Sequence, residues 1–531
     1  MDLHGKDVYG VDRLRRALTQ FVGGRIVQGL GQAMLVLTLV RVLSPADFGI
    51  YMLLIGLAET MLAIGSLGTL QAGRRFVPRF VVGLPGHRLR GIIVLLIAVQ
   101  LCALALITAM LGLMWHVVSP VIGLSDEYRD VARIALLLFV LVPAMNFSCE
   151  LLDSLLEQGR SRLVVSLLVF GRIAGIGVLL ALSASPLELR QILLLDAVLV
   201  GMVLLLSYLL LWRSLGRLRN PDARGAIPWA EMMRFARHMV PVDLLGACSS
   251  PGALRLVVTA ALGAVDGGMF AFLQSLQRLA GRYLPGTLLR GIVMPMLVAR
   301  SGLPGGRAMV ETGASVLVKS NLMMVSAGAV IIAVCGDELV VALSGDRFQN
   351  AGETLLLLYV GLAVTGQRAT IEMVMQVLGY GAVLGATALV APLALIGMWL
   401  VAPYGLNWAI LVMIVASALA NGAATLVLAR GPGGFEFEWG GQARIVVSAL
   451  LASAIGLAIT ASGGSPIAWG AVSLMALLLM QPLLRPFTAT EVVMVEKALG
   501  ANLVTSGLRL LSRSPSGDGG ARDEAIRGTE R

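Results

Sequence analysis

Two long stretches of this sequence contain no charged residue, and they restrict the fold more than any other feature. No Asp, Glu, Lys or Arg occurs in residues 382–429 or in residues 445–484. A helix needs roughly 20 apolar residues to cross a bilayer core about 30 Å thick. Each stretch is therefore long enough for two membrane spans, and turn-forming residues at 402–405 and 462–466 divide them. Both stretches predict helical hairpins.

The remaining sequence is nearly as apolar, which excludes most classes of protein. Hydrophobic residues make up 57% of the chain and charged residues 14%, and the mean hydropathy is +0.86. Soluble proteins carry about 25% charged residues, so this chain must use lipid as its solvent. The net charge of +10 comes almost entirely from arginine. A GC-rich genome produces the same bias, so the charge does not indicate a nucleic-acid partner.

The motifs give no support for enzyme chemistry. The four cysteines and four histidines show no spacing typical of a metal or redox site. Gly5-Lys6 is not followed by Ser or Thr, so it is not a phosphate-binding ATPase loop. No HExxH or GxSxG motif occurs in a usable context. We therefore expect no enzyme activity, no cofactor and no metal.

Apolar length along the whole chain predicts an all-α fold. We expect a polytopic membrane protein with about 14 transmembrane helices in two six-helix lobes plus a C-terminal helical hairpin. Pro285-Gly286 predicts a kink in the eighth span, and no span shows the alternation of an outer-membrane barrel. The expected spans are residues 21–42, 48–72, 91–116, 131–156, 163–184, 191–212, 239–262, 268–297, 314–335, 354–378, 382–402, 407–429, 443–461 and 466–485.

The distribution of charge predicts how these spans are organised. Arginines are concentrated in the loops after the second and sixth spans, and acidic residues in those after the third and ninth. The positive-inside rule then places both termini in the cytoplasm. Two equal bundles joined by a linker are typical of transporters. The expected parts are a cytoplasmic N-terminus at 1–20, an N-lobe at 21–212, a cytoplasmic linker at 213–238, a C-lobe at 239–429, an extra hairpin at 443–485 and a partly disordered cytoplasmic tail at 486–531.

The turn between the first two spans carries a recognisable motif. Residues 24–27 read GRIV, and residues 40–51 read VRVLSPADFGIY. Pro45 suits the first turn of a helix, and Ser44 or Asp47 can cap it. Phe48 and Tyr51 suit the aromatic belt of a membrane interface. The motif, with GSLG at 65–68, RRF at 74–76 and LEQGR at 156–160, resembles the polysaccharide transporter family. These are the oligosaccharide-lipid flippases of the multidrug/oligosaccharidyl-lipid/polysaccharide exporter superfamily.

The second lobe is similar to that family through Pro241, the turn at Gly267-Gly268, and Pro295. Many relatives have an Asp-Arg pair in the seventh span, whereas here Arg255 follows Leu254 and the acid is missing. The resemblance implies a flippase for a polyprenyl-pyrophosphate-linked oligosaccharide in the bacterial cytoplasmic (inner) membrane. Alternating access would serve the synthesis of O-antigen, capsule or exopolysaccharide. The implied partners are the lipid-linked oligosaccharide, membrane lipids and a polysaccharide polymerase.

Two polar stripes occur at helical spacing within apolar spans. Polar side chains facing lipid are costly, so such stripes usually face a cavity or a partner. Arginine can bind pyrophosphate oxygens in paired, charge-assisted hydrogen bonds, so we interpret the stripes as a basic, substrate-binding wall. The alternative is that Arg25 extends to the lipid headgroups and the others form ion pairs. The stripes are Arg25, Gln28 and Gln32 in the first span and Gln274, Arg278 and Arg282 in the eighth.

Other charged residues within the spans are candidates for ion pairs or for coupling to an ion. Arg368 and Glu372 have the i, i+4 spacing of a pair within one helix. Lys319 and Asp196 are further candidates for ion pairs. The candidates for coupling or pairing are Glu59, Arg172, Asp243 and Arg255.

Three other functions are weighed against this one. A peptidoglycan-precursor lipid flippase also has fourteen spans, and its loss would cause lysis rather than loss of surface glycan. A cation-coupled multidrug exporter usually has twelve spans and needs an acidic cavity, whereas the stripes here are basic. A membrane-embedded glycan polymerase or ligase carries a large external loop, and none is expected here. Uphill transport without an ATPase motif would draw on an ion gradient, the membrane potential or consumption of the product.

Overall fold

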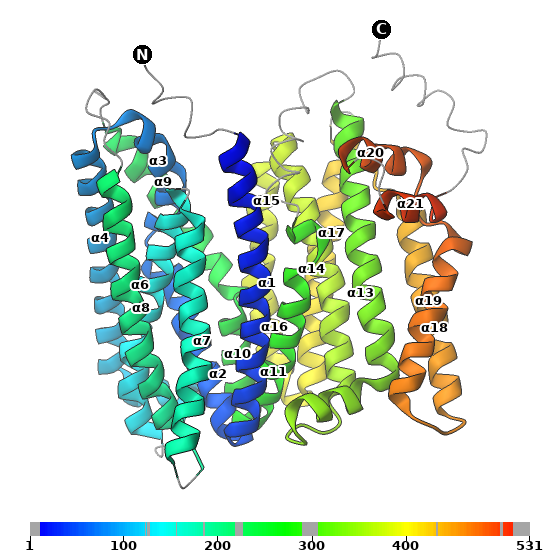
Figure 1. The fold of residues 1–531 in the computed structure, drawn as a ribbon, viewed down its shortest axis with the longest axis horizontal. Coiled ribbons are helices and arrows are strands. Elements are labelled where there is room, and N and C mark those ends of the chain that lie inside the picture. Colours follow the sequence, from blue (N-terminus) through cyan, green and yellow to red (C-terminus); the bar gives the residue numbers. More distant parts are fainter. Residues whose placement is uncertain are drawn as a thin grey trace. The chain divides into compact units, whose positions relative to one another are not determined.

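The computed structural model describes residues 11–122, 124, 128–155, 157–183, 186–217, 227–288, 306–431, 434–499 and 503–512. Within these ranges the ordered elements are helices and no strand occurs, which confirms the predicted all-α fold (Figure 1). The chain forms two compact units, residues 1–272 and 273–531. The prediction of six-span lobes divided by a linker at 213–238 stays a prediction.

The first unit contains ten helices of the described chain and the start of an eleventh. They are α1 (Val11–Val42), α2 (Pro45–Gly65), α3 (Thr69–Gly83), α4 (Gly86–Leu113), α5 (Trp115–Val121), α6 (Arg129–Ser154), α7 (Gln158–Leu182), α8 (Leu189–Arg217), α9 (Trp229–Cys248), α10 (Pro251–Leu262) and the first part of α11 (Ala264–Arg282). The helix α1 packs along α7, and α2 packs against α6 and α10. An apolar core that includes Phe76 and Phe80 joins α3, α4, α6, α8 and α9.

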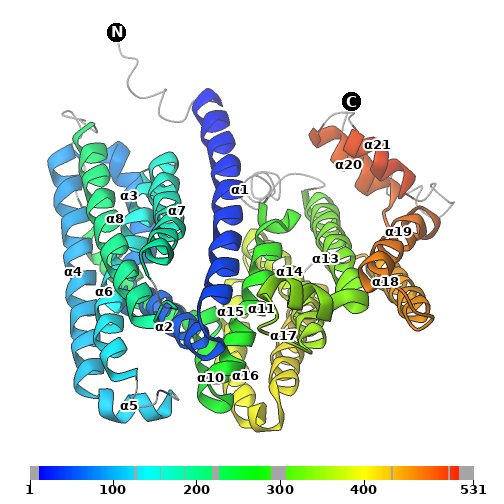
Figure 2. The same cartoon turned by 60° about the horizontal axis from the view of Figure 1, so that its bottom comes forward.

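The second unit is built around α13, which is kinked at Cys335. Besides the end of α11, it contains α13 (Gly306–Ser344), α14 (Gly352–Leu378), α15 (Gly381–Ala388), α16 (Val390–Val401), the 3-10 turn η2 (Ala402–Tyr404), α17 (Leu406–Arg430), α18 (Trp439–Thr460), α19 (Pro466–Leu484), α20 (Ala489–Leu499) and α21 (Leu503–Leu510). The hairpin of α18 and α19 packs on α13 (Figure 2). Both predicted hairpin turns therefore lie where the sequence placed them.

Local signals explain where several helices begin and end. Pro45 is the first residue of α2, and the Ser44 hydroxyl accepts a hydrogen bond from the Asp47 amide at 3.1 Å. This is the predicted N-cap. In the eighth span, α11 ends at Arg282, and beyond it the Gly286 amide donates to the Asn321 side chain in α13 at 2.8 Å. The last expected residues of that span, 289–297, lie outside the described residues.

Eleven helices of the described chain are long and apolar enough to cross a membrane, or twelve if the bent pair α9 and α10 is one span. The protein is therefore a multi-pass membrane protein. Two expected spans are not among the twelve, and they are the first and the eighth. In the first, only Ile26–Val42 qualifies, as a shorter apolar helix. In the eighth, α11 carries Asp266, Arg278 and Arg282. Both expected spans include residues that are not described, namely the side chain of Arg25 and residues 289–297.

Candidate functional site

One of the three stripe residues on α1, Gln28, contacts a side chain of α7. The side chain of Arg25 lies outside the described residues, and Gln28 and Gln32 are half-buried. Arg162 on α7 donates to the Gln28 side-chain oxygen at 3.5 Å and also lies 3.4 Å from Asp153 on α6. A basic residue of a neighbouring helix therefore supplies the polar partner of Gln28.

The stripe on α11 lies within the second unit. Gln274 is buried, and Arg278 and Arg282 are half-buried, one and two turns further along the helix. Beside them, Gln277 donates from its amide to the backbone oxygen of Leu358 on α14 at 2.7 Å. Two guanidinium groups thus occupy one side of a helix at intermediate burial, where a charge is costly unless a partner or a ligand compensates it.

A polar layer near the corner between α2 and α3 was not predicted as a group. Ser66 and Gln71 donate hydrogen bonds to the Asp243 carboxylate on α9, at 3.2 and 3.0 Å. Arg74 on α3 forms an ion pair with Glu150 on α6 at 2.8 Å. The sequence named Asp243 as a candidate but could not identify its neutral partners, because they lie 172 and 177 residues away.

A second, buried polar network in the first unit joins α2, α7 and α8. Asp196 on α8 is 1% exposed, and its carboxylate contacts the Arg172 guanidinium on α7 at 2.9 Å. The Tyr51 hydroxyl on α2 donates to the other carboxylate oxygen at 2.8 Å. Arg255 on α10 is buried and donates to the backbone oxygen of Met52 at 3.4 Å. Glu59, further along α2, is exposed.

The second unit contains an ion-pair network around a lysine that is 0% exposed. Lys319 on α13 forms ion pairs with Glu438, which precedes α18, and with Glu491 on α20. Its ammonium also lies 5.7 Å from the centre of the Phe487 ring. Lys319 is a charged residue within an apolar expected span, which is the signal that pointed to it. Nothing local indicated either carboxylate.

The predicted pair on α14 is formed within one helix. Arg368 contacts Glu372 at 2.8 Å and also donates to the Thr387 hydroxyl on α15 at 2.7 Å. Among the described residues, no group of three His, Cys, Asp or Glu side chains could hold a metal ion.

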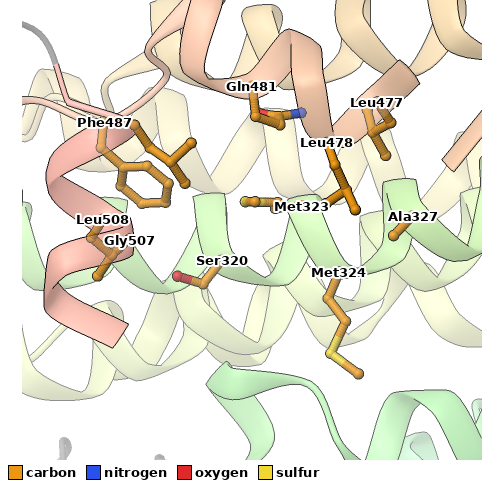
Figure 3. A pocket seen from close by; sticks show the side chains of 11 residues that line it. Ser320, Met323, Met324, Ala327, Leu477, Leu478, Gln481, Phe487, Gly507 and Leu508 are labelled. Atoms are coloured by element: carbon orange, nitrogen blue, oxygen red, sulfur yellow. The ribbon is translucent and has the colours of Figure 1, made fainter. Parts of the chain in front are cut away.

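An open, apolar pocket of about 450 Å³ lies between α13, α19 and the segment that follows α19 (Figure 3). Met323, Met324, Leu477 and Leu478 form much of its wall, and Phe487 and Leu508 close one end. Gln481 also lines it, is 1% exposed, and donates to the Ser448 hydroxyl at 2.7 Å. The side-chain oxygen of Gln481 has no hydrogen-bond partner among the described residues. The pocket suits a hydrocarbon chain better than a polar solute.

Comparison with solved structures identifies the fold. One similar structure is the lipid II flippase MurJ in an inward closed conformation, with a TM-score of 0.60 and 9% identity, covering 90% of this chain and 98% of that one. Another is a variant of the Vibrio cholerae MATE transporter VcmN, with a TM-score of 0.52 and 14% identity, covering 78% of this chain and 97% of that one. The sequence matches no protein-family model and no curated protein.

This chain has the fold of both structures. One is a lipid flippase and the other a transporter. Because both identities are low, the likeness concerns the fold, and the substrate must be argued from the residues of this chain.

Proposed function

We propose that this protein is a flippase that moves a polyprenyl-pyrophosphate-linked oligosaccharide across the bacterial cytoplasmic membrane by alternating access. The transported glycan would enter O-antigen, capsule or exopolysaccharide, and a polysaccharide polymerase would act after it. Both termini would lie in the cytoplasm. The observation that carries the proposal is the pair Arg278 and Arg282, half-buried one turn apart on α11 of a chain with a lipid-flippase fold.

The chemistry of this pair suits a pyrophosphate. Each guanidinium presents planar donors that match two phosphate oxygens, and a partly desolvated site strengthens such contacts relative to water. Gln274 provides a neutral amide on the same helix, of the kind that hydrogen-bonds sugar hydroxyls. The prenyl chain would remain in lipid beside the protein. Transport would then depend on an ion gradient, the membrane potential or removal of the product, as the sequence predicts.

Two alternatives each have one observation in their favour. The similarity to MurJ favours a peptidoglycan-precursor lipid flippase, whose substrate would place the same demand on the arginines. The similarity to a MATE transporter favours a cation-coupled multidrug exporter. A cationic drug would be repelled by Arg278 and Arg282, which is the reason we place this alternative last.

The decisive experiment substitutes the two arginines in the native host. Arg278→Ala and Arg282→Ala should each abolish surface polysaccharide while the protein still inserts in the membrane at normal levels. Arg278→Lys keeps the charge but loses the paired geometry, so it should restore only part of the export. Arg430→Ala, at the exposed last residue of α17, is the matched control and should export normally.

The outcomes separate the three functions. Normal polysaccharide from both alanine variants would exclude these residues from the site. If depletion of the protein causes lysis and stops wall synthesis, the peptidoglycan-precursor flippase is favoured. Export of cationic dyes that does not change in Arg278→Ala would favour the drug exporter.

A further inference from the structure

Arginines gather in the first unit where the start of α4 meets the end of α8, two neighbouring helices (Figure 2). The Arg90 guanidinium on α4 lies 5.5 Å from the centre of the Trp212 ring on α8. One turn further along α8, a Cβ atom placed on Gly216 would lie 3.5 Å from Nη2 of Arg90. The Arg90 side chain therefore lies across the face of α8 that carries Trp212 and Gly216.

Two more arginines on α8 flank this contact. Arg213 and Arg217 directly follow Trp212 and Gly216 in the sequence, and both are exposed. They are one helical turn apart, a spacing at which like charges repel each other. We call Arg90, Arg213 and Arg217 the α4–α8 arginine cluster. Three positive charges on two packed helices favour a negatively charged ligand.

No carboxylate of the described chain balances this cluster. Neither α4 nor residues 197–217 of α8 contain an acidic residue. The Nε atom of Arg90 is buried and has no hydrogen-bond partner among the described residues, a state that costs free energy. Arg160 on α7 is different: it donates to Ser214 on α8 and forms an ion pair with Glu157 at 3.3 Å. The cluster therefore differs from a neighbouring arginine whose charge is paired within the protein.

An exposed apolar surface extends from the cluster along both helices. On α8, Leu209 and Leu205 lie one and two turns before Trp212 on the same side of the helix, and both are exposed. On α4, Val94 lies one turn beyond Arg90 and is also exposed. Trp212 is 55% exposed and lies between the charged and the apolar parts, as tryptophans do at a membrane interface. A phospholipid presents the same order, with a charged phosphate followed by hydrocarbon.

We propose that the α4–α8 arginine cluster is a binding site for an anionic phospholipid. Its phosphate oxygens accept hydrogen bonds from the unpartnered Nε of Arg90 and from the guanidinium groups of Arg213 and Arg217. Its acyl chains lie along Leu205, Leu209 and the neighbouring surface of α4. The predicted orientation places this lipid in the cytoplasmic leaflet, where basic pockets between spans bind anionic headgroups. A zwitterionic phospholipid carries its own cation and gains less from the cluster.

The bound lipid joins α4 to α8 and stabilises the first unit, because a ligand that binds only the folded state raises its stability. This site is independent of which solute the protein transports. It can be tested on the purified full-length protein without any glycan substrate.

The first test compares two lipids by native mass spectrometry. The protein in neutral detergent is titrated with phosphatidylglycerol and with phosphatidylcholine of the same acyl chains. The wild type should bind phosphatidylglycerol several-fold more tightly. Arg213→Gln should weaken phosphatidylglycerol binding roughly fivefold and leave phosphatidylcholine binding unchanged. The preference should disappear in the triple variant with Arg90→Gln, Arg213→Gln and Arg217→Gln.

A matched triple variant controls for net charge. It removes three exposed arginines from α3 and α9, which share an apolar core with the start of α4 and the end of α8. This variant should keep the preference for phosphatidylglycerol. Equal loss in both triple variants, or no preference in the wild type, would overturn the proposal. The substitutions in the control are Arg79→Gln, Arg234→Gln and Arg237→Gln.

The second test separates lipid binding from a structural role. Arg213→Gln with Arg217→Gln changes only exposed side chains and leaves the contact of Arg90 with Trp212 in place. Phosphatidylglycerol should raise the unfolding temperature of the wild type but not that of this double variant. Without lipid, the two proteins should unfold at the same temperature. If lipid stabilises both equally, the proposal is wrong.

The same measurement distinguishes a lipid from a free phosphate. Glycerol phosphate has the charged group of the lipid without its acyl chains, so at the same concentration it should not stabilise the wild type. If it stabilises the wild type as much as phosphatidylglycerol does, the cluster binds soluble phosphates and the assignment to a phospholipid fails.

Discussion

Lys319 and Glu491 are 172 residues apart, and the lysine ammonium donates to both oxygens of the carboxylate at 2.9 and 2.8 Å. Glu438 contacts the same ammonium from the segment before α18. The lysine therefore joins α13 to the hairpin of α18 and α19 and to the segment that follows it. That segment is the first part of the tail expected from residue 486, and it packs as α20 and α21 over its described residues.

Removing the lysine should be strongly destabilising. Lys319→Met leaves two buried or partly buried carboxylates without their cation, a change that typically costs about 3–5 kcal/mol. The apparent unfolding temperature in detergent should fall clearly, and adding Glu491→Gln should recover part of the loss. Arg133→Met is the control, because Arg133 and Asp130 form an exposed pair with side chains 81% and 73% accessible, worth about 0–1 kcal/mol. If Lys319→Met and Arg133→Met lower the unfolding temperature equally, the buried ion pairs of Lys319 do not stabilise the fold as predicted.

The Tyr51, Asp196 and Arg172 network should respond unequally to its two donors. Tyr51→Phe removes one hydrogen bond to a charged group, worth about 1.5–3 kcal/mol. Arg172→Met leaves the buried Asp196 carboxylate without its cation and should cost more. Thermal unfolding of both single variants and of the double variant gives the coupling energy. Strictly additive losses would show that the two contacts do not form one network.

The corner between α2 and α3 should not accept a side chain at Gly68. This residue has φ +77°, and its Cβ would overlap the backbone oxygen of Ala236 on α9. Strained backbone of this kind costs about 1–3 kcal/mol before the clash is counted, so Gly68→Ala should lower stability and the yield of folded protein. Gly246→Ala, in open space within α9, should be neutral or slightly stabilising. Size-exclusion chromatography in detergent compares the two.

The contact between α20 and α21 should weaken in acid. Arg509 donates to Glu496 at 3.1 Å, and this hydrogen bonding lowers the pKa of the Glu496 carboxyl. A lowered pKa stabilises the folded form above the unfolded value of about 4.3, and that contribution is lost as the pH falls through the lower folded value. Limited proteolysis of the C-terminal segment should therefore accelerate below pH about 4. Arg509→Met should show a smaller pH dependence.

The helices were largely predictable from local pattern. In lipid every backbone group must be satisfied within a helix, so an uncharged stretch such as residues 382–429 has few alternatives to a helical hairpin. The Ser44–Pro45 start of α2 and the i, i+4 pair of Arg368 and Glu372 also depend on residues that are neighbours in sequence. The polar stripes could also be recognised from their helical spacing. The groups that bind Gln28 and Gln277 lie on other helices and could not be predicted.

The sequence alone determined that this chain is a helical membrane protein and where most of its spans lie. It could do so because the length and charge of an apolar stretch are local properties. Tertiary structure decided which distant groups meet: Glu491 with Lys319, Asp243 with Ser66, and Gly252 with Gly56. Each of these contacts depends on how helices pack, and packing brings together residues that sequence separation keeps unrelated. The break at Ser249–Ser250 divides one expected span into two helices that contact α2 through different residues, Asp243 on α9 and Gly252 on α10.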